Sequence, residues 1–246
     1  MTRFLTILFT FIVLMSSIFS GCKGPEGPVG PPGPELTGNL FGFVNLTKQD
    51  GTAMLDRSGV QVTIEGTSVS TNPDSAGRWV LSNLKTGTYN ISLSKSGFGT
   101  AKAISYQFIG GGDVYFGKWV LYQIPDYYVS ALTDTLIGAS VEIHGRMSGN
   151  AAYRRNVIVF FGSDSTGPGF NNFSVSAPLS VRAGDSTFLI PVGVQSLHSW
   201  GFQSGSVAYL AAYTFTGITS YDDTFTGQRV YTSFNATVAR TRIAVP

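Results

Sequence analysis

Alternation of apolar and polar residues over short runs is the feature that most constrains how this chain can fold. Residues 60–64 and 139–143 each carry an apolar side chain at every second position, as a half-buried β-strand does. Dense turn signals, such as Asn-Pro-Asp-Ser-Ala-Gly at residues 72–77, separate the runs. No stretch combines helical periodicity with capping residues. The sequence therefore predicts an all-β protein.

A proline in the segment Ile124-Pro125-Asp126 interrupts the alternation near the middle of the chain and predicts a linker at residues 123–126. We expect two tandem β-sandwich domains, at residues 36–122 and 127–246, each large enough for its own core. The more uniformly apolar run from Asn156 to Phe161 predicts a strand buried on both faces. Further strands are expected at residues 78–82, 100–108, 114–121, 188–194, 207–215, 229–234 and 237–245.

The first predicted domain resembles the carboxypeptidase regulatory-like domain, a seven-stranded β-sandwich of the transthyretin type. The resemblance implies a non-catalytic accessory module, and no functional residue is carried over from it. The matching blocks, in order, are Gly42-Phe43-Val44, residues 59–67, residues 74–79, residues 84–89 and Ser96-Gly97-Phe98.

The second predicted domain is similar to sandwiches of the immunoglobulin or fibronectin type III kind. The run Val207 to Tyr213, with its alternating tyrosines, resembles the penultimate strand of such domains. The chain has a single cysteine, so a disulfide like that of antibody domains is excluded.

The first 21 residues have the three parts of an export signal. Arg3 is followed by an apolar run from Phe4 to Met15 and then by small residues up to Gly21. The boundary Phe19-Ser20-Gly21-Cys22 resembles the lipobox of bacterial lipoproteins, which implies removal of residues 1–21 and lipidation of Cys22. Lys23 after the cysteine resembles an outer-membrane sorting signal. The alternatives are an ordinary secretory signal or an uncleaved N-terminal helix.

Residues 22–35 contain a short Gly-X-Y repeat, GPEGPVGPPGP from Gly24 to Pro34, which resembles collagen. Its prolines favour the extended polyproline II conformation, so we expect a stiff tether between the lipid and the first domain. A trimer formed through this stretch is the alternative.

The residue types that carry most enzymatic chemistry are scarce. His144 and His198 are the only histidines and have no zinc-ligand spacing, and no G-x-S-x-G motif occurs, so we expect neither metal nor cofactor. The adjacent acids Asp222 and Asp223 leave a carbohydrate-active hydrolase as a remote alternative. With 16 Lys and Arg residues against 14 Asp and Glu residues, nothing points to nucleic acid.

Large aromatic residues in two polar stretches are the candidate ligand contacts. Trp200, Phe202, Tyr221 and Phe225 lie in glycine-containing segments between predicted strands, where exposed rings could stack on sugars or anchor a protein partner. The alternative is that these rings fold back and close the end of the sandwich. The Asp-Ser/Thr pairs that begin at residues 74, 134, 164 and 185 resemble O-glycosylation acceptors of exported Gram-negative proteins; ordinary turn chemistry is the alternative.

These features predict a non-catalytic protein that is lipid-anchored to a bacterial outer membrane and exposed at the cell surface. Its sandwiches would bind a glycan or an envelope protein. An adhesin or scaffold subunit that pairs through a sheet edge is the main alternative.

Overall fold

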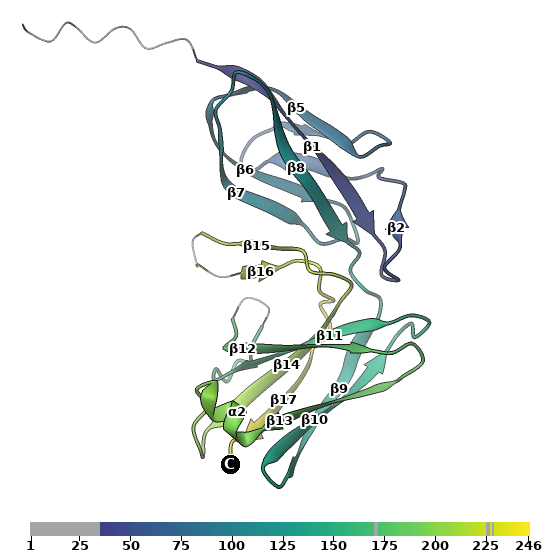
Figure 1. Ribbon diagram of the computed structural model, residues 1–246, viewed down its shortest axis with the longest axis vertical. Coiled ribbons are helices and arrows are strands. Elements are labelled where there is room, and N and C mark those ends of the chain that lie inside the picture. The colour runs from purple at the N-terminus through teal and green to yellow at the C-terminus, as the bar shows by residue number, and fades with distance from the viewer. Residues whose placement is uncertain (1–34, 170–171, 225–226, 228) are drawn as a thin grey trace, which may run out of the picture. The chain divides into compact units, whose positions relative to one another are not determined.

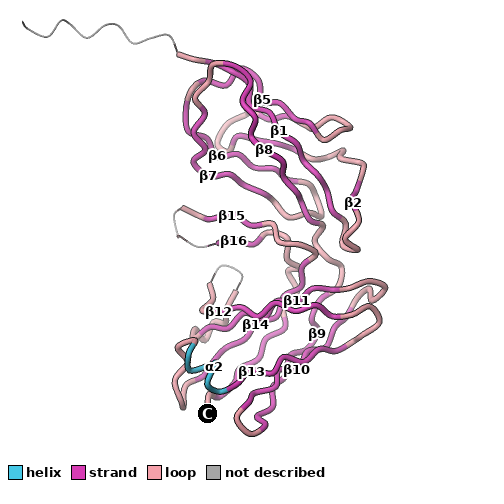
Figure 2. The backbone as a smooth tube through the Cα atoms, in the orientation of Figure 1, coloured by secondary structure: helices cyan, strands magenta, loops and turns pink. Residues whose placement is uncertain are grey.

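The computed structural model describes residues 35–169, 172–224, 227 and 229–246. Residues Glu35–Pro246 form one compact unit. The predicted signal peptide, Cys22 and all but the last residue of the predicted tether lie outside the described residues. The prediction of an all-β protein is confirmed, because strands arranged in packed sheets dominate the described chain (Figures 1 and 2).

Two four-stranded sheets form the first sandwich. In one sheet, β1 pairs antiparallel with β2 and β5 and parallel with β8; the other sheet has the order β4-β3-β6-β7. The strands are β1 (Thr37–Thr47), β2 (Ala53–Met54), β3 (Gln61–Ile64), β4 (Ser70–Thr71), β5 (Arg78–Lys85), β6 (Gly87–Ser94), β7 (Ala101–Phe108) and β8 (Gly112–Tyr122).

The alternation expected in this half is present in the core. Val60, Val62 and Ile64 are at most 2% exposed and pack with Trp79 and Leu81 from the facing sheet. Burial of such side chains is the main favourable contribution to folding, at about 25 cal/mol for each Å² of apolar surface removed from water.

The second sandwich is built from a three-stranded sheet, β13-β10-β9, and a four-stranded sheet, β12-β11-β14-β17, with a separate hairpin, β15-β16. Its elements are β9 (Tyr128–Ile137), β10 (Ser140–Ser148), β11 (Arg155–Gly162), β12 (Val175–Val181), β13 (Thr187–Gly193), α2 (Val194–Ser199), β14 (Val207–Phe215), β15 (Ser220–Asp222), β16 (Arg229–Tyr231) and β17 (Ala239–Ala244).

The strand expected to be buried on both faces is β11. Val157 and Val159 point into the core between the two sheets. Ile158 and Phe160 belong to a separate apolar cluster with Phe234, on the other face of the same sheet. The prediction for residues 156–161 is therefore confirmed.

Several elements differ from the sequence-based expectation, among them α2, β9 and β12. The short helix α2 occupies residues expected to be strand and loop, and Gly193, which precedes it at the N-cap position, provides no side-chain cap. Strand β12 was not predicted although Val175, Ala177, Leu179 and Val181 alternate with other residues, because one of these other residues is Pro178, and a proline within a run argues against a strand. Helix α2 and strand β12 depend on tertiary contacts more than on local preference.

Because Gly42 has no side chain, β1 can pack closely against the Trp79 ring and the neighbouring strand β8. A Cβ atom built there would lie 2.6 Å from the Trp79 ring and 2.7 Å from the carbonyl oxygen of Gly117. Trp79 itself is 1% exposed and makes an edge-on contact with Phe116, 5.4 Å between ring centroids. The backbone of β1 is thus held between a buried ring and the neighbouring strand.

We expect Gly42→Ala to lower the free energy of unfolding by at least about 1–3 kcal/mol, the usual cost of overpacking a core. Gly87→Ala is the matched control, because its Cβ would lie 3.4 Å from the Tyr89 hydroxyl, in ordinary contact. Urea unfolding followed by tryptophan fluorescence measures both values. Equal midpoints for the two variants would contradict this account of Gly42.

Candidate functional site

The outer face of the β1 sheet carries aromatic side chains where a sandwich usually presents polar ones. Along β1, Leu40 and Val44 are fully buried in the core, whereas Phe41 and Phe43 point to the opposite face and are half-buried. Side chains on a strand alternate between the two faces, so both phenylalanines lie on one side of the sheet.

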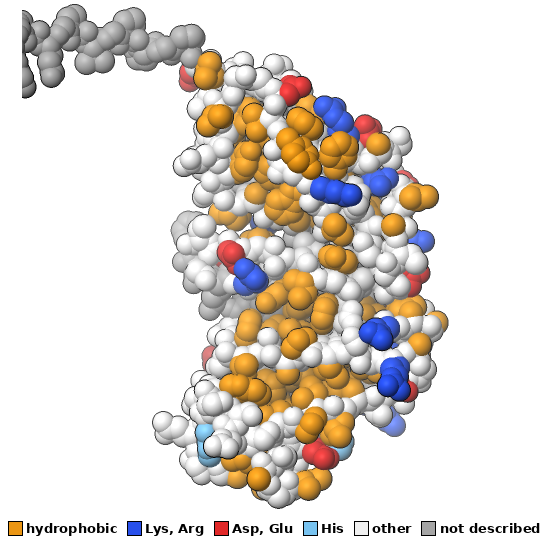
Figure 3. Space-filling view, in the orientation of Figure 1, with side chains coloured by type: hydrophobic (Ala, Val, Ile, Leu, Met, Phe, Trp, Pro, Cys, Tyr) orange, Lys and Arg blue, Asp and Glu red, His pale blue; other side chains and the backbone are white. Residues whose placement is uncertain are grey.

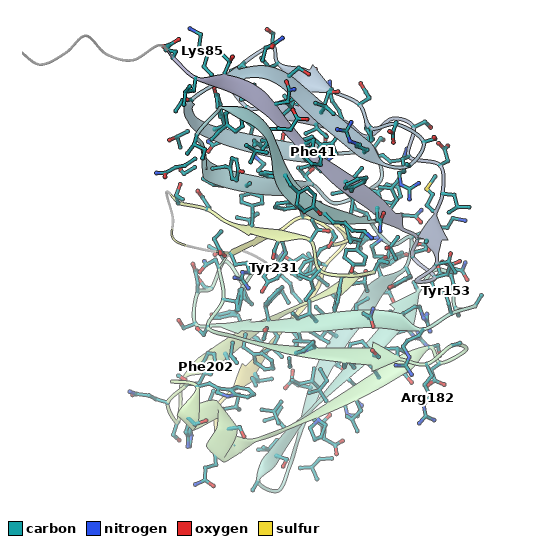
Figure 4. All side chains as sticks on the ribbon, turned by 45° about the horizontal axis from the view of Figure 1, so that its top comes forward. Phe41, Lys85, Tyr153, Arg182, Phe202 and Tyr231 are labelled. Atoms are coloured by element: carbon teal, nitrogen blue, oxygen red, sulfur yellow. The ribbon has the colours of Figure 1, made fainter. Side chains whose placement is uncertain are left out.

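A third ring comes from β8, which is far from β1 in the sequence. Tyr115 is directly opposite Phe41 in the parallel pairing and is 55% exposed. Its ring centroid lies 5.5 Å from that of Phe41 and 6.4 Å from that of Phe43. We call these three residues the aromatic platform; Phe41 is labelled in Figure 4, and Figure 3 shows apolar side chains gathered over β1 and β8.

An irregularity in β8 puts Tyr115 on this face. The pairing with β1 shifts between Phe41 and Gly42, so that one extra residue of β8 is accommodated. Gly117 has a φ of +127°, which a residue with a side chain rarely adopts. Phe116 and Trp119 can therefore both pack against the core, with their rings stacked 5.4 Å apart, while Tyr115 stays outside.

Charged and polar groups surround the platform. The Arg78 guanidinium lies 5.0 Å from the centroid of the Phe41 ring, a cation–π contact. Lys118 is opposite Phe43 and is exposed. Beyond Phe41, the amide nitrogen of Asn39 donates a hydrogen bond of 2.8 Å to the Asp113 carboxylate.

This arrangement offers the groups that a binding surface needs. Rings at the surface offer apolar faces of the kind that stack on sugars, and hydrogen-bonding groups at the rim can orient hydroxyls. The carboxylate at the rim, Asp113, is already engaged by Asn39.

Phe202, a predicted contact residue, is not available at the surface. It is 4% exposed and belongs to the core of the second sandwich, so its prediction as an exposed ligand contact is wrong. The N–H of Phe202 donates to the Leu197 carbonyl and that of Gly201 to the His198 carbonyl, each at 3.0 Å. This is a Schellman closure of α2, with Gly201 at φ +95°, and it turns Phe202 back against buried Leu197.

Trp200 is half-buried and packs against the same core, 5.4 Å from the Phe161 ring. Open hollows of about 390 and 370 Å³ adjoin the turn after it, and Phe202 contributes to the lining of both. The alternative, that rings of this segment fold back onto the sandwich, holds for Phe202, which is buried. It holds only partly for Trp200, which is half-buried.

The second predicted pair lies elsewhere. Tyr221 is in β15, half-buried, with the ammonium of Lys102 5.1 Å from its ring centroid. Phe225 lies outside the described residues. Asp222 forms an ion pair with Arg229, 2.9 Å from carboxylate oxygen to Nε. The hydrogen bond from Arg229 lowers the pKa of this carboxyl, which keeps Asp222 in its ionised form.

The histidines occupy unrelated positions. His144 is exposed on β10, 3.4 Å from the Glu142 carboxylate, and His198 Nε2 lies 3.3 Å from the Pro246 carbonyl oxygen. In the described part of the chain, no three His, Cys, Asp or Glu side chains gather closely enough to hold a metal ion. Within those same residues, no helix has the length and apolar character needed to cross a bilayer.

Sequence reasoning missed the aromatic platform although its signal is present. The run Leu40-Phe41-Gly42-Phe43-Val44 is apolar on both faces of a strand, whereas one face of a two-layer sandwich is normally polar. Tyr115 had no such signal, because its position depends on the irregularity at Gly117.

Comparisons with known proteins give limited information. No family model matches the chain, and no curated protein matches it. Among solved structures it is similar to a candidate carbohydrate-binding protein from Bacteroides uniformis, at 13% identity and a TM-score of 0.30, over 85% of this chain and all of the other. A DUF3823 family protein from Parabacteroides merdae shares 13% identity, with a TM-score of 0.29, over 84% and 99% of the two chains.

A type II cohesin–X-dockerin complex from Acetivibrio cellulolyticus matches at 20% identity and a TM-score of 0.30 over 35% of this chain. The match spans 57% of the length of that protein. At TM-scores of this size we draw no functional conclusion from the likeness.

Alanine substitutions test whether Phe202 packs in the core and Tyr115 lies at the surface. We expect Phe202→Ala to destabilise the protein by about 3–5 kcal/mol because it empties a core site. Tyr115→Ala should change stability by less than about 0.5 kcal/mol, as substitutions at exposed positions usually do. Thermal unfolding by circular dichroism measures both; equal losses would contradict the placement of the two rings.

Proposed function

We propose that this chain is a non-catalytic, lipid-anchored protein of a bacterial outer membrane, and that it binds a glycan on the aromatic platform of its first sandwich. The observation that carries the proposal is the adjacency of three surface rings, Phe41, Phe43 and Tyr115, with Arg78 and Lys118 at the rim.

Glycan binding suits the chemistry of this face. Sugars present apolar C–H faces that stack on aromatic rings, and hydroxyls that accept or donate hydrogen bonds at the edges of the ring. Arg78, Lys118, Asn39 and Asp113 supply donors and acceptors around the platform. The cation over Phe41 also holds that ring in place before any ligand binds.

The alternative of a scaffold that assembles through a sheet edge is less well supported. Several of the outer strands carry features that hinder pairing with another chain, although the edge strand β17 carries none of them. Ser105 in β7 has a φ of +55°, β8 is irregular at Gly117, and β12 and β13 contain Pro178 and Pro191. Positive φ, irregular register and proline all interrupt the row of backbone donors that an added strand would need.

The proposed location at the outer membrane rests on the sequence around Cys22. The lipobox-like boundary before Cys22 and the collagen-like stretch after it would place the sandwiches outside the membrane on a tether, facing outward. Several acyl chains at Cys22 would give a stable anchor, since one chain binds a bilayer only marginally.

Glycan binding is tested by isothermal titration of the purified protein against a panel of polysaccharides. We expect Phe43→Ala combined with Tyr115→Ala to weaken binding at least tenfold, because both stacking surfaces are lost. Leu136→Ala is the matched control, since Leu136 is also 55% exposed but belongs to β9 of the second sandwich. Absence of heat with every polysaccharide, or equal affinity of the double variant, would remove the proposal.

Lipidation is tested by metabolic labelling with palmitate. The wild-type protein should take up label, whereas Cys22→Ala should not, because the attachment sulfur is gone. Ser16→Ala, upstream of the boundary, should be labelled normally. Equal labelling of the Cys22 variant would show that the lipid anchor is wrong.

A further inference from the structure

The outer face of the β12-β11-β14-β17 sheet has an apolar part and, beside it, a basic part. Phe160, Tyr213 and Phe215 form an apolar cluster that Phe234 covers. On the edge strand β17, Arg240 is in the same cross-strand row as Phe160, and Arg242 is one row further, toward the end of β11; both arginines are exposed. The two arginines are two residues apart on one strand, so their side chains leave the sheet on the same face.

A loop after β11 makes this end of the sheet concave. Gly162, the last residue of β11, has no side chain, and Pro168 lies directly over it: a Cβ built at Gly162 would be 3.2 Å from that of Pro168. Gly167, at φ +85°, brings the loop equally close to Arg240, with 3.1 Å between its ideal Cβ and the arginine Nε. A side chain at position 167 would push Arg240 away.

The result is an open pocket of about 330 Å³ between the loop and the sheet. Tyr209 is paired directly with Arg242 across β14 and β17, and Arg240 is paired with the small residue Ala211. The polar residues of the lining share hydrogen-bond donor capacity; they are Ser165, Thr166, Tyr209, Arg240, Thr241 and Arg242.

The positive charges of Arg240 and Arg242 in this pocket are not neutralised by ion pairs. Among the described residues, the ion pairs involve Lys85, Lys102, His144 and Arg229, and neither Arg240 nor Arg242 takes part. The acid of the same loop, Asp164, accepts the N–H of Thr166 at 2.9 Å and closes the turn. Two neighbouring guanidinium groups repel each other, and a bound anion relieves that repulsion.

We propose that this pocket binds the oxyanion of an acidic sugar, a carboxylate or phosphate group, with the sugar ring against Tyr209. Guanidinium groups pair with carboxylate and phosphate through two parallel hydrogen bonds. Ser165 adds a hydroxyl to the lining, whereas the Thr166 side chain is already hydrogen-bonded to the Asp164 carboxylate. Tyr209 also lines the neighbouring hollow beside Phe202, so the site can extend to a second sugar unit. This site is separate from the aromatic platform and does not depend on the glycan proposal made for it.

Titration with small acidic sugars tests the site. Glucuronate supplies a carboxylate on a sugar ring, glucose 6-phosphate supplies a phosphate, and glucose is the neutral control. We expect binding of at least one of the two acidic sugars, with a salt-dependent affinity, and none of glucose at the same concentration. Failure of both acidic sugars to bind the full chain would overturn the proposal.

Arginine variants locate the binding. Arg240→Gln combined with Arg242→Gln should weaken the interaction at least tenfold, whereas Arg182→Gln should change it less than twofold. Arg182 is also exposed, follows β12, and is labelled in Figure 4 away from Phe202, which borders the neighbouring hollow. Equal weakening by the Arg182 variant would show a nonspecific effect of charge and overturn the proposal.

The melting temperature and two further variants distinguish loss of the binding site from loss of folding. The double arginine variant should keep the wild-type melting temperature within about 2 °C, since both side chains are exposed. Gly167→Val should weaken acidic-sugar binding while both arginines are retained, because it displaces Arg240. The platform variant carrying Phe43→Ala and Tyr115→Ala should bind acidic sugars as the wild type does; if it does not, the pocket is not an independent site.

Discussion

The close approach of β1, β5 and β8 around Gly42 is the constraint on which the first sandwich depends. A bare backbone at this position admits the Trp79 ring on one side and the Gly117 carbonyl on the other. Because Gly117 is also where the pairing of β1 with β8 shifts, the same contact sets which residues of β8 face inward. Core packing and the composition of the outer face are therefore decided together.

Both sandwiches use the two faces of a single strand for different purposes. In the first, β1 has Leu40 and Val44 in the core and Phe41 and Phe43 on an open face. In the second, β11 is covered on both faces, because the outer cluster around Phe160 is closed by residues from the segment after β14. An apolar outer face is thus sealed in one domain and left open in the other, and an open face of this kind commonly marks a binding surface.

Local pattern predicted several elements correctly because their causes are local. The alternation at Val60, Val62 and Ile64 and the continuous apolar run of β11 gave the right strands, since the spacing of apolar residues alone decides which faces can be buried. The candidate ligand contacts were predicted less well. The polar neighbours of Phe202 predict an exposed ring. The side chain instead turns inward because the hydrogen bonds that end α2 direct it toward Leu197, and no helix is predicted at these residues.

The sequence by itself determined that the chain is all-β and which strands carry apolar faces, since periodicity and turn residues act over a few positions. Only the tertiary structure decided which surfaces those strands assemble. Tyr115 reaches Phe41 through a parallel pairing between β1 and β8, and the Ser165–Gly167 loop reaches Arg240 across the β11-β14-β17 sheet. Such neighbours are set by strand order and register, which depend on how the whole core packs and not on the residues near each side chain in the sequence.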